Sequence, residues 1–492
     1  MYVRGTPQSR TATQPVESVL PHILADLILS IANNLDQSVA EAVRIGRQEL
    51  SQLWKWNGTM PPTIDQCIQD IISEKAQSQL DRPAVVSWDG EMTYRQLEER
   101  STNLARHLVD LGLQTGKAVP LCFEKSMWTI VGVLAVMKAG GALVLMDPSQ
   151  PEGRLSTIAS EVEAGFILTS EAQAALGARI VPGGKQVIVG PQNDEAEFKS
   201  LSVDLPVVPA SSTLYIQFTS GSTGKPKGVL ISHSNYTSGA LPRAEAVGYK
   251  EHSRVLDFPS YAFDVSVDCM LCTLANGGCI CVPSEDQRVN DLSGAIRKLN
   301  VNMAHMTPSV ARVLAPDIMP SLEVIGLGGE AISASDAAEW GQKTKIVIAY
   351  GPSECTVGCT INNDIPPGRS YTSIGQGVGG TTWVVDPSNH DRLMPIGTVG
   401  ELLIEGPVVG DGYLNNPEKT AEVFIEDPTW LVEGGGDVPG RKGRLYKTGD
   451  LVRYDPDASG SVVFIGRADQ QVKLRGQRVE LGEIEHHVRN YF

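Results

Sequence analysis

The sequence has little positive charge and lacks an apolar run long enough to span a membrane. Lysine and arginine total 41 against 57 aspartate and glutamate residues, so the 492-residue chain carries a formal net charge of −16. This excess of acidic residues disfavours a surface that binds nucleic acid, and it provides no basic patch that would bind an anionic membrane. An apolar segment at residues 19–31 is interrupted by Pro21 and Asp26 and is too short to cross a bilayer. With no signal peptide, we expect a cytoplasmic protein that binds neither nucleic acid nor membrane.

Cysteine is also scarce, at eight residues in the whole chain. In the absence of a secretory signal, this number indicates a reduced protein without disulfides. The spacings of Cys269 with Cys272 and of Cys279 with Cys281 are compatible with a metal site. Because these residues lie in an apolar stretch around 270–282, buried free thiols are the favoured interpretation.

Length and composition indicate a soluble chain with two or more lobes. A chain of 492 residues exceeds one compact core, and its 41% hydrophobic and 20% charged residues are ordinary for a globular protein. Between about residues 66 and 205, strand-like and helix-like segments alternate, which favours parallel sheet with crossover helices. The pattern predicts an N-cap at Thr93, a helix over 128–138, and strands at 84–88, 119–122, 142–146, 213–218, 229–231, 255–258, 346–350, 401–404 and 462–465.

A loop rich in glycine and hydroxyl groups, Phe218–Gly228, separates two of these strands. Glycine lets the backbone approach an anion closely, and successive N–H groups can converge on a phosphate. The loop is not a P-loop, because Gly224-Lys225 is followed by Pro226 and no helix start is evident. Taken alone, it is either a phosphate-binding loop or a flexible surface hairpin.

The loop resembles the phosphate loop of adenylate-forming enzymes, the superfamily of nonribosomal peptide synthetase adenylation domains, acyl-CoA synthetases and luciferases. The resemblance extends over about residues 60–492 in separate blocks that occur in the expected order: Tyr350-Gly-Pro-Ser-Glu354, Gly400-Glu-Leu-Leu403, Tyr446-Lys-Thr-Gly-Asp450, Gly466-Arg-Ala-Asp469 and Gly482-Glu-Ile-Glu485. Phe263-Asp264, Arg475-Gly-Gln-Arg478 and the last block look most like a nonribosomal peptide synthetase adenylation domain of the fungal type.

The resemblance implies an α/β fold with a large N-terminal core of two mixed or parallel sheets flanked by helices, and a smaller β-rich, barrel-like subdomain. The expected division is a disordered tail at 1–15, a helical inter-domain linker at 16–65, an adenylation core at 66–465 with its β-rich subdomain at about 371–465, and a hinge with the start of a truncated C-terminal subdomain at 466–492.

The implied chemistry requires ATP and Mg²⁺. Attack of a carboxylate on the α-phosphate of ATP brings two anions together, so positioning and electrostatic stabilisation must do most of the work. Glu354 matches the family's magnesium ligand, and a hard cation prefers oxygen donors. Without the resemblance, Glu354 is an acidic residue at a helix N-terminus. The residues with an expected catalytic role are Thr219, Lys227, Glu354 and Arg467.

The resemblance also assigns the nucleotide site. Tyr350 matches the residue that stacks on adenine, and Asp450 the carboxylate that accepts both ribose hydroxyls. The alternatives are a core tyrosine at a strand end and an ordinary Thr-Gly-Asp turn. Asp469 matches the hinge on which the C-terminal lobe rotates between half-reactions. The expected nucleotide-binding residues are Ser220, Gly221, Ser222, Thr223, Gly224, Gly329, Glu330, Ala331, Tyr350, Gly351 and Asp450.

Asp264 is the expected partner of the α-ammonium group of an amino acid. The pairing is physically sensible because a buried cation needs a buried partner, and the alternative is an exposed loop aspartate. Three glycines and an alanine leave room for a long side chain with a basic or hydroxamate-type group, such as ornithine or a modified ornithine; a large aromatic residue is the alternative. The expected substrate-site residues are Phe263, Asp264, Val265, Asp268, His305, Gly326, Gly328, Ala349, Val357 and Gly358.

The resemblance predicts an ATP-dependent ligase that forms an aminoacyl-AMP in secondary-metabolite or siderophore biosynthesis. The sequence stops at Phe492, before the family's second lysine, and no phosphopantetheine-accepting serine motif follows. We therefore expect a monomer with weakened adenylate formation and no thiol transfer. Its expected partners are a condensation domain and a carrier domain that bears phosphopantetheine. The rival interpretations are an acyl- or aryl-CoA ligase, whose substrate has no ammonium for Asp264, and a non-catalytic nucleotide-binding module.

Overall fold

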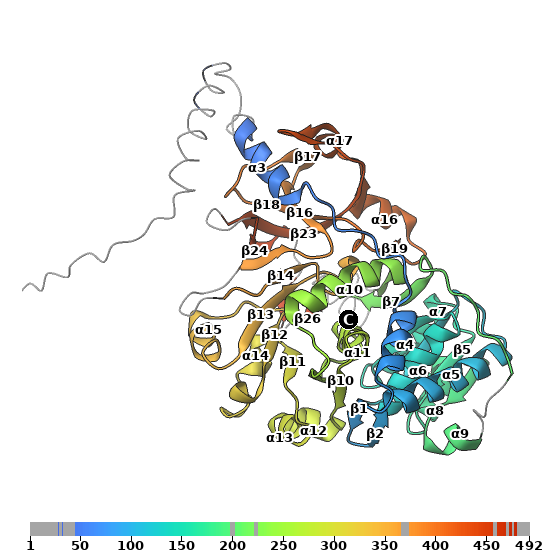
Figure 1. Cartoon of the computed structure of the whole chain (residues 1–492). Helices are drawn as coiled ribbons and strands as arrows, with labels where there is room; N and C mark the ends of the chain where they lie inside the picture. Colours follow the sequence, from blue (N-terminus) through green and yellow to red (C-terminus); the bar gives the residue numbers. More distant parts are fainter. Residues whose placement is uncertain are drawn as a thin grey trace, which may run out of the picture.

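Two sheets with helices packed against them form the framework of the chain (Figure 1). The computed structural model describes residues 28, 32, 45–196, 202–220, 225–365, 373–455, 460–468, 472–474 and 477–479. The predicted tail at 1–15 and most of the predicted linker before residue 45 lie outside the described residues. The described helices are α3 (Arg47–Asn57), α4 (Ile68–Ser78), α5 (Tyr94–Asp110), α6 (Met127–Lys138), α7 (Glu152–Glu161), α8 (Ala174–Ile180), α9 (Pro191–Ala196), α10 (His233–Val247), α11 (Val265–Ala275), α12 (Glu285–Asn290), α13 (Leu292–Lys298), α14 (Pro308–Ala311), α15 (Ala334–Trp340), α16 (Pro417–Val423) and α17 (Thr429–Glu433), with the 3₁₀ turns η1 (Met319–Ser321) and η2 (Ser353–Cys355).

The smaller sheet is built from the alternation of strands and helices that the sequence predicts. Its first strands pair in parallel, because helices α6, α7 and α8 carry the chain back between them. Two antiparallel strands complete one edge. In spatial order the strands are β19 (Gly412–Tyr413), β8 (Lys227–Ser232), β7 (Thr213–Thr219), β4 (Ala142–Met146), β3 (Ala118–Cys122), β5 (Phe166–Thr169) and β6 (Lys185–Ile188).

The larger sheet changes from mostly parallel to antiparallel pairing after β13. Strand β15 pairs with both β14 and β24, so the β-rich region is hydrogen-bonded to the core. In order the strands are β17 (Asn389–Leu393), β16 (Thr381–Asp386), β18 (Gly400–Glu405), β23 (Arg444–Tyr454), β24 (Val462–Arg467), β15 (Ser373–Gly377), β14 (Thr360–Asn362), β13 (Lys345–Tyr350), β12 (Val324–Leu327), β11 (Met303–Met306), β9 (Arg254–Leu256), β10 (Cys279–Val282), β1 (Pro83–Ser87) and β2 (Gly90–Thr93), with β20 (Phe424–Glu426) on β23. Short hairpins are β21 (Gly434–Gly435) with β22 (Val438–Pro439), and β25 (Val472–Leu474) with β26 (Gln477–Val479).

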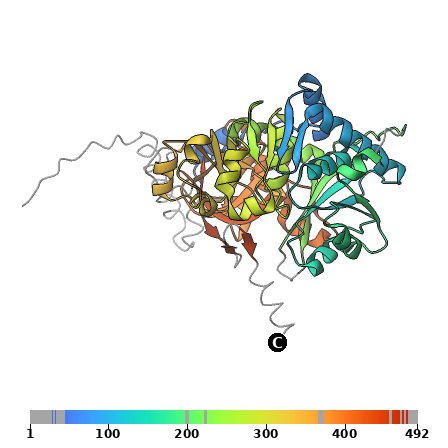
Figure 2. The ribbon, with the colours of Figure 1, turned by 90° about the horizontal axis from the view of Figure 1, so that it is seen from below.

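Local sequence explains the start of α5. The Thr93 side chain accepts a hydrogen bond from the Gln96 amide at 3.3 Å, and the Gln96 side chain accepts one from the Thr93 amide at 2.9 Å. This capping box confirms the predicted N-cap. Residues 90–93 form strand β2, for which the sequence analysis made no prediction. Gly90, at φ 146°, makes the tight turn that folds β2 back onto β1 at the sheet edge, where the two strands are blue in Figure 2.

The described end of the predicted linker packs on the β-rich region. Helix α3 lies over this region in Figure 1, and its Trp54 is fully buried with the ring of Trp383 at 5.1 Å between centroids. The Asn57 amide donates a hydrogen bond to the Tyr454 hydroxyl at 3.2 Å, and Arg441 donates to the Asn57 carbonyl at 2.8 Å. These contacts join two segments that are almost 400 residues apart in the sequence.

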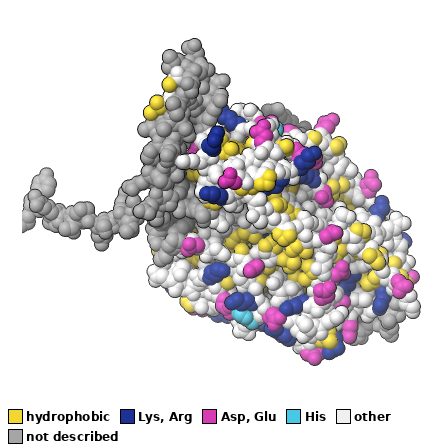
Figure 3. All heavy atoms as spheres, turned by 45° about the horizontal axis from the view of Figure 1, so that its top comes forward, with side chains coloured by type: hydrophobic (Ala, Val, Ile, Leu, Met, Phe, Trp, Pro, Cys, Tyr) yellow, Lys and Arg dark blue, Asp and Glu magenta, His cyan; other side chains and the backbone are white. Residues whose placement is uncertain are grey.

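The cysteine prediction is confirmed, because all eight cysteines are free and buried. Within the described residues there is no cluster of three potential His, Cys, Asp or Glu ligands for a metal. None of the described helices combines the length and the apolar character needed to cross a bilayer. On the face shown in Figure 3, lysine and arginine side chains are scattered among aspartate and glutamate side chains.

Helices α10 and α11 lie between the two sheets near the centre of Figure 1. Helix α10 contacts β7 and β8 of the smaller sheet and β14 of the larger one. Helix α11 contacts α10 and strands β9 and β10 of the larger sheet. This arrangement brings side chains from both sheets and both helices to one region, where the predicted site residues lie.

Candidate active site

The two ends of the glycine-rich loop are fixed by the β7–β8 hairpin. Thr219 ends β7 and is the cross-strand partner of Lys227, which begins β8. The Thr219 Oγ1 atom is buried and has no hydrogen-bond partner among the residues that the structure describes. Ser220 follows and is half-buried. The other predicted loop residues, Gly221, Ser222, Thr223 and Gly224, lie outside the described residues.

Glu354 and Lys227 both lie next to the side chain of Tyr413. Glu354 is fully buried in η2, and its Oε1 accepts a hydrogen bond from the Tyr413 hydroxyl at 2.7 Å. The Lys227 Nζ atom lies 5.2 Å from the centre of the same ring. Tyr413 reaches this position because β19 pairs with β8. Our sequence analysis did not identify Tyr413, whose only signal is an aromatic residue after Gly412 in a glycine-rich segment.

A second cluster joins β13 to the β-rich region. The Tyr350 hydroxyl donates a hydrogen bond to Asp450 Oδ2 at 2.5 Å, and Arg467 Nη1 donates to Asp450 Oδ1 at 2.9 Å. Asp450 and Arg467 are cross-strand partners on β23 and β24. Burial and the neighbouring Asp450 carboxylate raise the pKa of Tyr350 well above its ordinary value, so the phenol stays protonated and donates. The predicted adenine and ribose residues are therefore in direct contact.

The backbone beside Tyr350 requires glycine at two positions. Gly329 has φ 78°, in the left-handed region that favours glycine. A Cβ atom on Gly351 would lie 2.5 Å from the Val357 carbonyl oxygen. The Glu330 side chain accepts a hydrogen bond from the Ser309 hydroxyl at 2.5 Å, and Ala331 is exposed.

Asp264 is a buried carboxylate at the N-terminus of α11. Only 7% of the residue is exposed, and its Oδ2 atom has no hydrogen-bond partner within the described part of the chain. Burial raises its pKa to about 6, although a hydrogen bond with the Ser353 side chain and the charge of Arg243 act in the opposite direction. The preceding Phe263 is 39% exposed. Such an unsatisfied, buried oxygen fits a cationic group that arrives with a ligand.

The predicted substrate wall comes from neighbouring elements. His305 on β11 and Gly326 on β12 are register partners, and Ala349 lies on β13, which is the next strand. The His305 Nε2 atom and the Tyr249 hydroxyl share a hydrogen bond of 2.8 Å. Burial lowers the pKa of His305 to about 4, so the imidazole is neutral at pH 7. A Cβ atom on Gly326 would collide with the His305 ring, and one on Gly328 would lie 3.1 Å from the Ala349 carbonyl oxygen.

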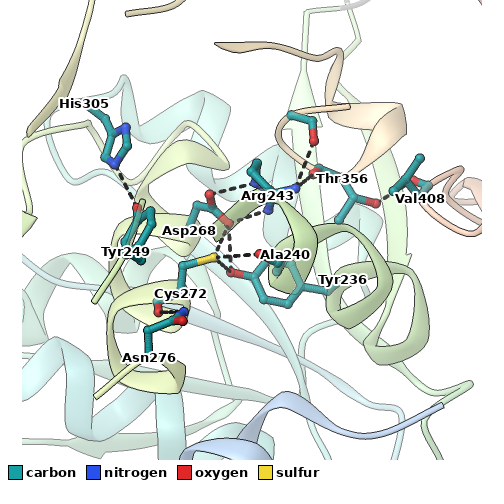
Figure 4. A network of polar contacts seen from close by, with 11 residues as sticks. Tyr236, Ala240, Arg243, Tyr249, Asp268, Cys272, Asn276, His305, Thr356 and Val408 are labelled. Carbon is teal, nitrogen blue, oxygen red and sulfur yellow. Dashed lines mark hydrogen bonds and ion pairs between the residues drawn. The ribbon is translucent and has the colours of Figure 1, made fainter. Parts of the chain in front are cut away.

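Asp268 is paired with an arginine that the sequence analysis missed. Figure 4 shows Arg243 of α10 against its carboxylate, with Nε–Oδ2 at 3.0 Å and Nη2–Oδ1 at 2.5 Å. Although burial opposes ionisation, the Arg243 charge and hydrogen bonds hold the pKa of Asp268 below its ordinary value. Arg243 also donates to the Thr356 and Gly358 carbonyls at 3.1 and 2.9 Å. Its sequence signal was a charged residue in a helix otherwise rich in small residues.

The remaining predicted residues are distributed as follows. Val265 is half-buried at the start of α11, next to Asp264. Val357 has φ 69° and Gly358 packs against Arg243, so both belong to the turn that Arg243 holds. The predicted hinge residue, Asp469, lies outside the described residues.

Comparisons with known proteins identify the family and the fold of the chain. The model of the family described as AMP-binding enzyme matches residues 72–414. The chain is 67% identical over 468 residues to nonribosomal peptide synthetase 1 of Ajellomyces capsulatus, covering 94% of this chain and 26% of that protein. It is 62% identical over 444 residues to nonribosomal peptide synthetase SIDD of Beauveria bassiana, covering 90% of this chain and 24% of that protein. The chain thus spans about a quarter of the length of these curated relatives.

Among solved structures, the fold matches NpsA-ThdA, an artificially fused adenylation–PCP di-domain from Klebsiella oxytoca. The TM-score is 0.74 at 26% identity, with 86% of this chain and 83% of that chain covered. The predicted α/β fold is confirmed by this match. The chain belongs to the family of AMP-binding enzymes, and within it to the adenylation domains of nonribosomal peptide synthetases.

Proposed function

We propose that the chain activates an α-amino acid with ATP, forming an aminoacyl-AMP and releasing pyrophosphate, as one domain of a nonribosomal peptide synthetase that makes a secondary metabolite such as a siderophore. The observation that carries this proposal is the buried Asp264 Oδ2 atom without a partner in the described residues. An amino acid supplies the missing cation, whereas a fatty or aryl acid does not. This contrast disfavours an acyl- or aryl-CoA ligase.

Two groups of residues are placed to bind the triphosphate of ATP and its magnesium ion. Lys227 and the buried Thr219 hydroxyl, at the mouth of the β7–β8 loop, suit the triphosphate. Glu354, held by Tyr413, suits a magnesium ion, since Mg²⁺ is usually bound by one or two carboxylates together with phosphate oxygens. When bound, that ion supplies charge neutralisation between the phosphates.

Tyr350, Asp450 and Arg467 form the part of the site that we propose binds the nucleoside of ATP. The Asp450 carboxylate is already oriented by hydrogen bonds from both neighbours. We propose that it receives the ribose hydroxyls and that the Tyr350 ring lies against adenine, with the backbone of residues 328–331 beside it. Asp264 then fixes the α-ammonium, which places the substrate carboxylate toward the phosphates.

Amino-acid-dependent exchange of pyrophosphate into ATP tests the proposal. It is measured on this chain and on a longer chain that continues past Phe492, with a panel of amino acids and with simple carboxylic acids. We expect exchange with a long, polar amino acid of the ornithine type. Exchange only with carboxylic acids that lack an amino group would favour the ligase alternative. Nucleotide binding with no exchange by either chain would favour the non-catalytic module.

The pH dependence of kcat/KM for the amino acid should reflect the ionisation of the buried Asp264 side chain. Because burial raises the pKa of Asp264 to about 6, the carboxylate is ionised above pH 6 and neutral below it. Only the ionised form attracts the substrate ammonium, so kcat/KM for the amino acid should fall about tenfold per pH unit below 6 and level off above 7. A profile that stays flat down to pH 5 in the exchange assay would count against this role.

Gly326→Ala should narrow the substrate pocket. The new methyl group collides with the His305 ring, so the ring must shift into the space left for a long side chain. Overpacking of this kind costs roughly 1–3 kcal/mol, and we expect kcat/KM for a long amino acid to fall about tenfold or more, with a smaller effect on alanine. Gly153→Ala is the control, because a Cβ atom there meets nothing within 4 Å. Equal losses for long and short amino acids would contradict the placement of Gly326.

A further inference from the structure

Tyr413 occupies a short strand that is fixed to the strand carrying Lys227. It belongs to β19, which pairs with β8 at the edge of the smaller sheet and lies beside α16 (Figure 1). On either side of Tyr413, the amides of Asp411 and Leu414 donate hydrogen bonds to carbonyl oxygens of β8, at 2.9 and 2.8 Å. Tyr413 itself is 6% exposed. Its backbone therefore keeps a fixed place relative to β8, which begins at Lys227.

The side chain of Tyr413 contacts both charged groups that we propose for ATP and its metal. Its hydroxyl donates a hydrogen bond to Glu354 Oε1 at 2.7 Å. The Lys227 Nζ atom lies 5.2 Å from the centre of its ring, within the range of a cation–π interaction. The nearby Gly410 amide donates to the Glu354 carbonyl oxygen at 2.9 Å. One short segment, residues 410–413, therefore holds the main chain and the side chain of Glu354 and also contacts Lys227.

Packing limits the movement of the Tyr413 ring. The ring of Phe424 meets it edge-on, at 5.5 Å between centroids and 74° between planes. The Arg444 guanidinium lies 4.8 Å from the centre of the Phe424 ring, and it also donates a hydrogen bond to the Asp411 carbonyl at 2.9 Å. Arg444 thus supports both the neighbouring ring and the chain that leads into β19. The direction of the Tyr413 hydroxyl is therefore set by the protein itself, as preorganisation of a site requires.

The donors in this region fit a magnesium ion that is bound together with phosphate oxygens. Glu354 is fully buried, and the buried Thr219 hydroxyl oxygen lacks a hydrogen-bond partner among the described residues. Mg²⁺ is usually bound by one or two carboxylates together with substrate phosphates. The phenol of Tyr413 orients the carboxylate without cancelling its negative charge, whereas an arginine in its place would compete with the metal for that charge. Hydrogen bonds of this kind fix the orientation of metal-binding carboxylates.

We propose that Tyr413 is a positioning residue whose hydroxyl orients the Glu354 carboxylate for magnesium and whose ring places the Lys227 ammonium group for the triphosphate. This inference rests on the proposed function, because it requires ATP and its magnesium ion to bind here. Tyr413 acts through Glu354 and Lys227, and it is assigned no contact with the reacting atoms. Because the hydroxyl and the ring have separate roles, two substitutions distinguish them.

The test measures the Kd of ATP by calorimetry, in Mg²⁺ and in EDTA, without amino acid. Tyr413→Phe keeps the ring and removes the hydroxyl, so the affinity in Mg²⁺ should fall about 10- to 100-fold while the affinity in EDTA changes by less than about twofold. Tyr413→Leu removes the ring as well, and the affinity in EDTA should then also fall, by about threefold or more. Tyr454→Phe is the control, because it removes another buried hydroxyl, which donates to the Thr382 carbonyl outside this cluster.

A double variant tests whether Tyr413 acts through Glu354. In the Glu354→Gln background, Tyr413→Phe should change the affinity in Mg²⁺ by less than about twofold, since substitutions of residues in contact are not additive. Additive losses, or equal losses in Mg²⁺ and in EDTA for Tyr413→Phe alone, would reduce Tyr413 to a structural residue. An unmodified chain that binds ATP no more tightly in Mg²⁺ than in EDTA would instead overturn the proposed magnesium site. Because Tyr413→Phe keeps the packing of the ring, it decides the inference even if Tyr413→Leu fails to fold.

Discussion

Asp264→Asn is expected to lower kcat/KM for the amino acid by roughly 10²- to 10³-fold, because losing one partner of a buried charge pair costs about 2–5 kcal/mol. The asparagine keeps the size of the side chain but offers no charge to the α-ammonium. The Asp264 Oδ2 atom has no hydrogen-bond partner in the described residues, and burial already penalises the charged form, so removing the charge costs the unliganded fold little. We therefore expect the loss to appear in substrate recognition and not in stability.

The measurement is steady-state pyrophosphate exchange at varied amino-acid concentration, with nucleotide affinity determined separately. ATP binding should change by less than about threefold, since Asp264 does not belong to the Tyr350–Asp450 cluster. Asp286→Asn is the matched control, because it removes the same charge from an exposed position on α12. Similar kinetics for both variants would remove Asp264 from the amino-acid site.

Lys125→Met is expected to destabilise the fold by roughly 3–5 kcal/mol, as is typical when one partner of a buried ion pair is removed. Lys125 Nζ lies 2.6 Å from Asp257 Oδ1, and their side chains are 4% and 0% exposed. The ammonium also lies 3.8 Å from the centre of the Tyr261 ring, whose hydroxyl donates to Asp257 Oδ2 at 3.1 Å. Because Lys125 follows β3 and Asp257 follows β9, the pair connects the two sheets.

Urea or thermal unfolding provides the measurement for this variant. The exposed pair of Lys419 and Glu422 is the control, and Lys419→Met should cost less than about 1 kcal/mol. The double variant Lys125→Met/Asp257→Leu should recover much of the loss, because it leaves no buried charge unpaired. A loss below about 1 kcal/mol for Lys125→Met alone would show that Asp257 finds another partner or water.

Elements with a strong local pattern were predictable from the sequence. The strand predicted at 142–146 matches β4 residue for residue, and the helix predicted at 128–138 differs from α6 by one residue at its start. In both, the apolar runs and the glycine pair after Ala139 define the element. Strand β2 was missed, because four residues between a turn and a helix are too few for a periodic pattern.

For the candidate site, the sequence could nominate residues but could not indicate their hydrogen-bond partners. The sequence placed Asp268 and His305 in the wall, yet it gave no indication that Arg243 and Tyr249 are bound to them. Those partners lie 25 and 56 positions away and meet them only when α10, α11 and β11 pack together. The same applies to Tyr413, which reaches Glu354 across 59 positions through the pairing of β19 with β8.

The packing of α3 on the β-rich region has a consequence for synthesis on the ribosome. Asn57 contacts Tyr454, which is 397 positions later. At 5–20 residues per second, the helix emerges about 20–80 s before its binding surface exists. During that interval the indole rings of Trp54 and Trp56 have no native surface to cover them. Helix α3 therefore completes its packing only after the β-rich region has been synthesised, and until then its aromatic side chains are a target for a chaperone that shields nascent apolar segments.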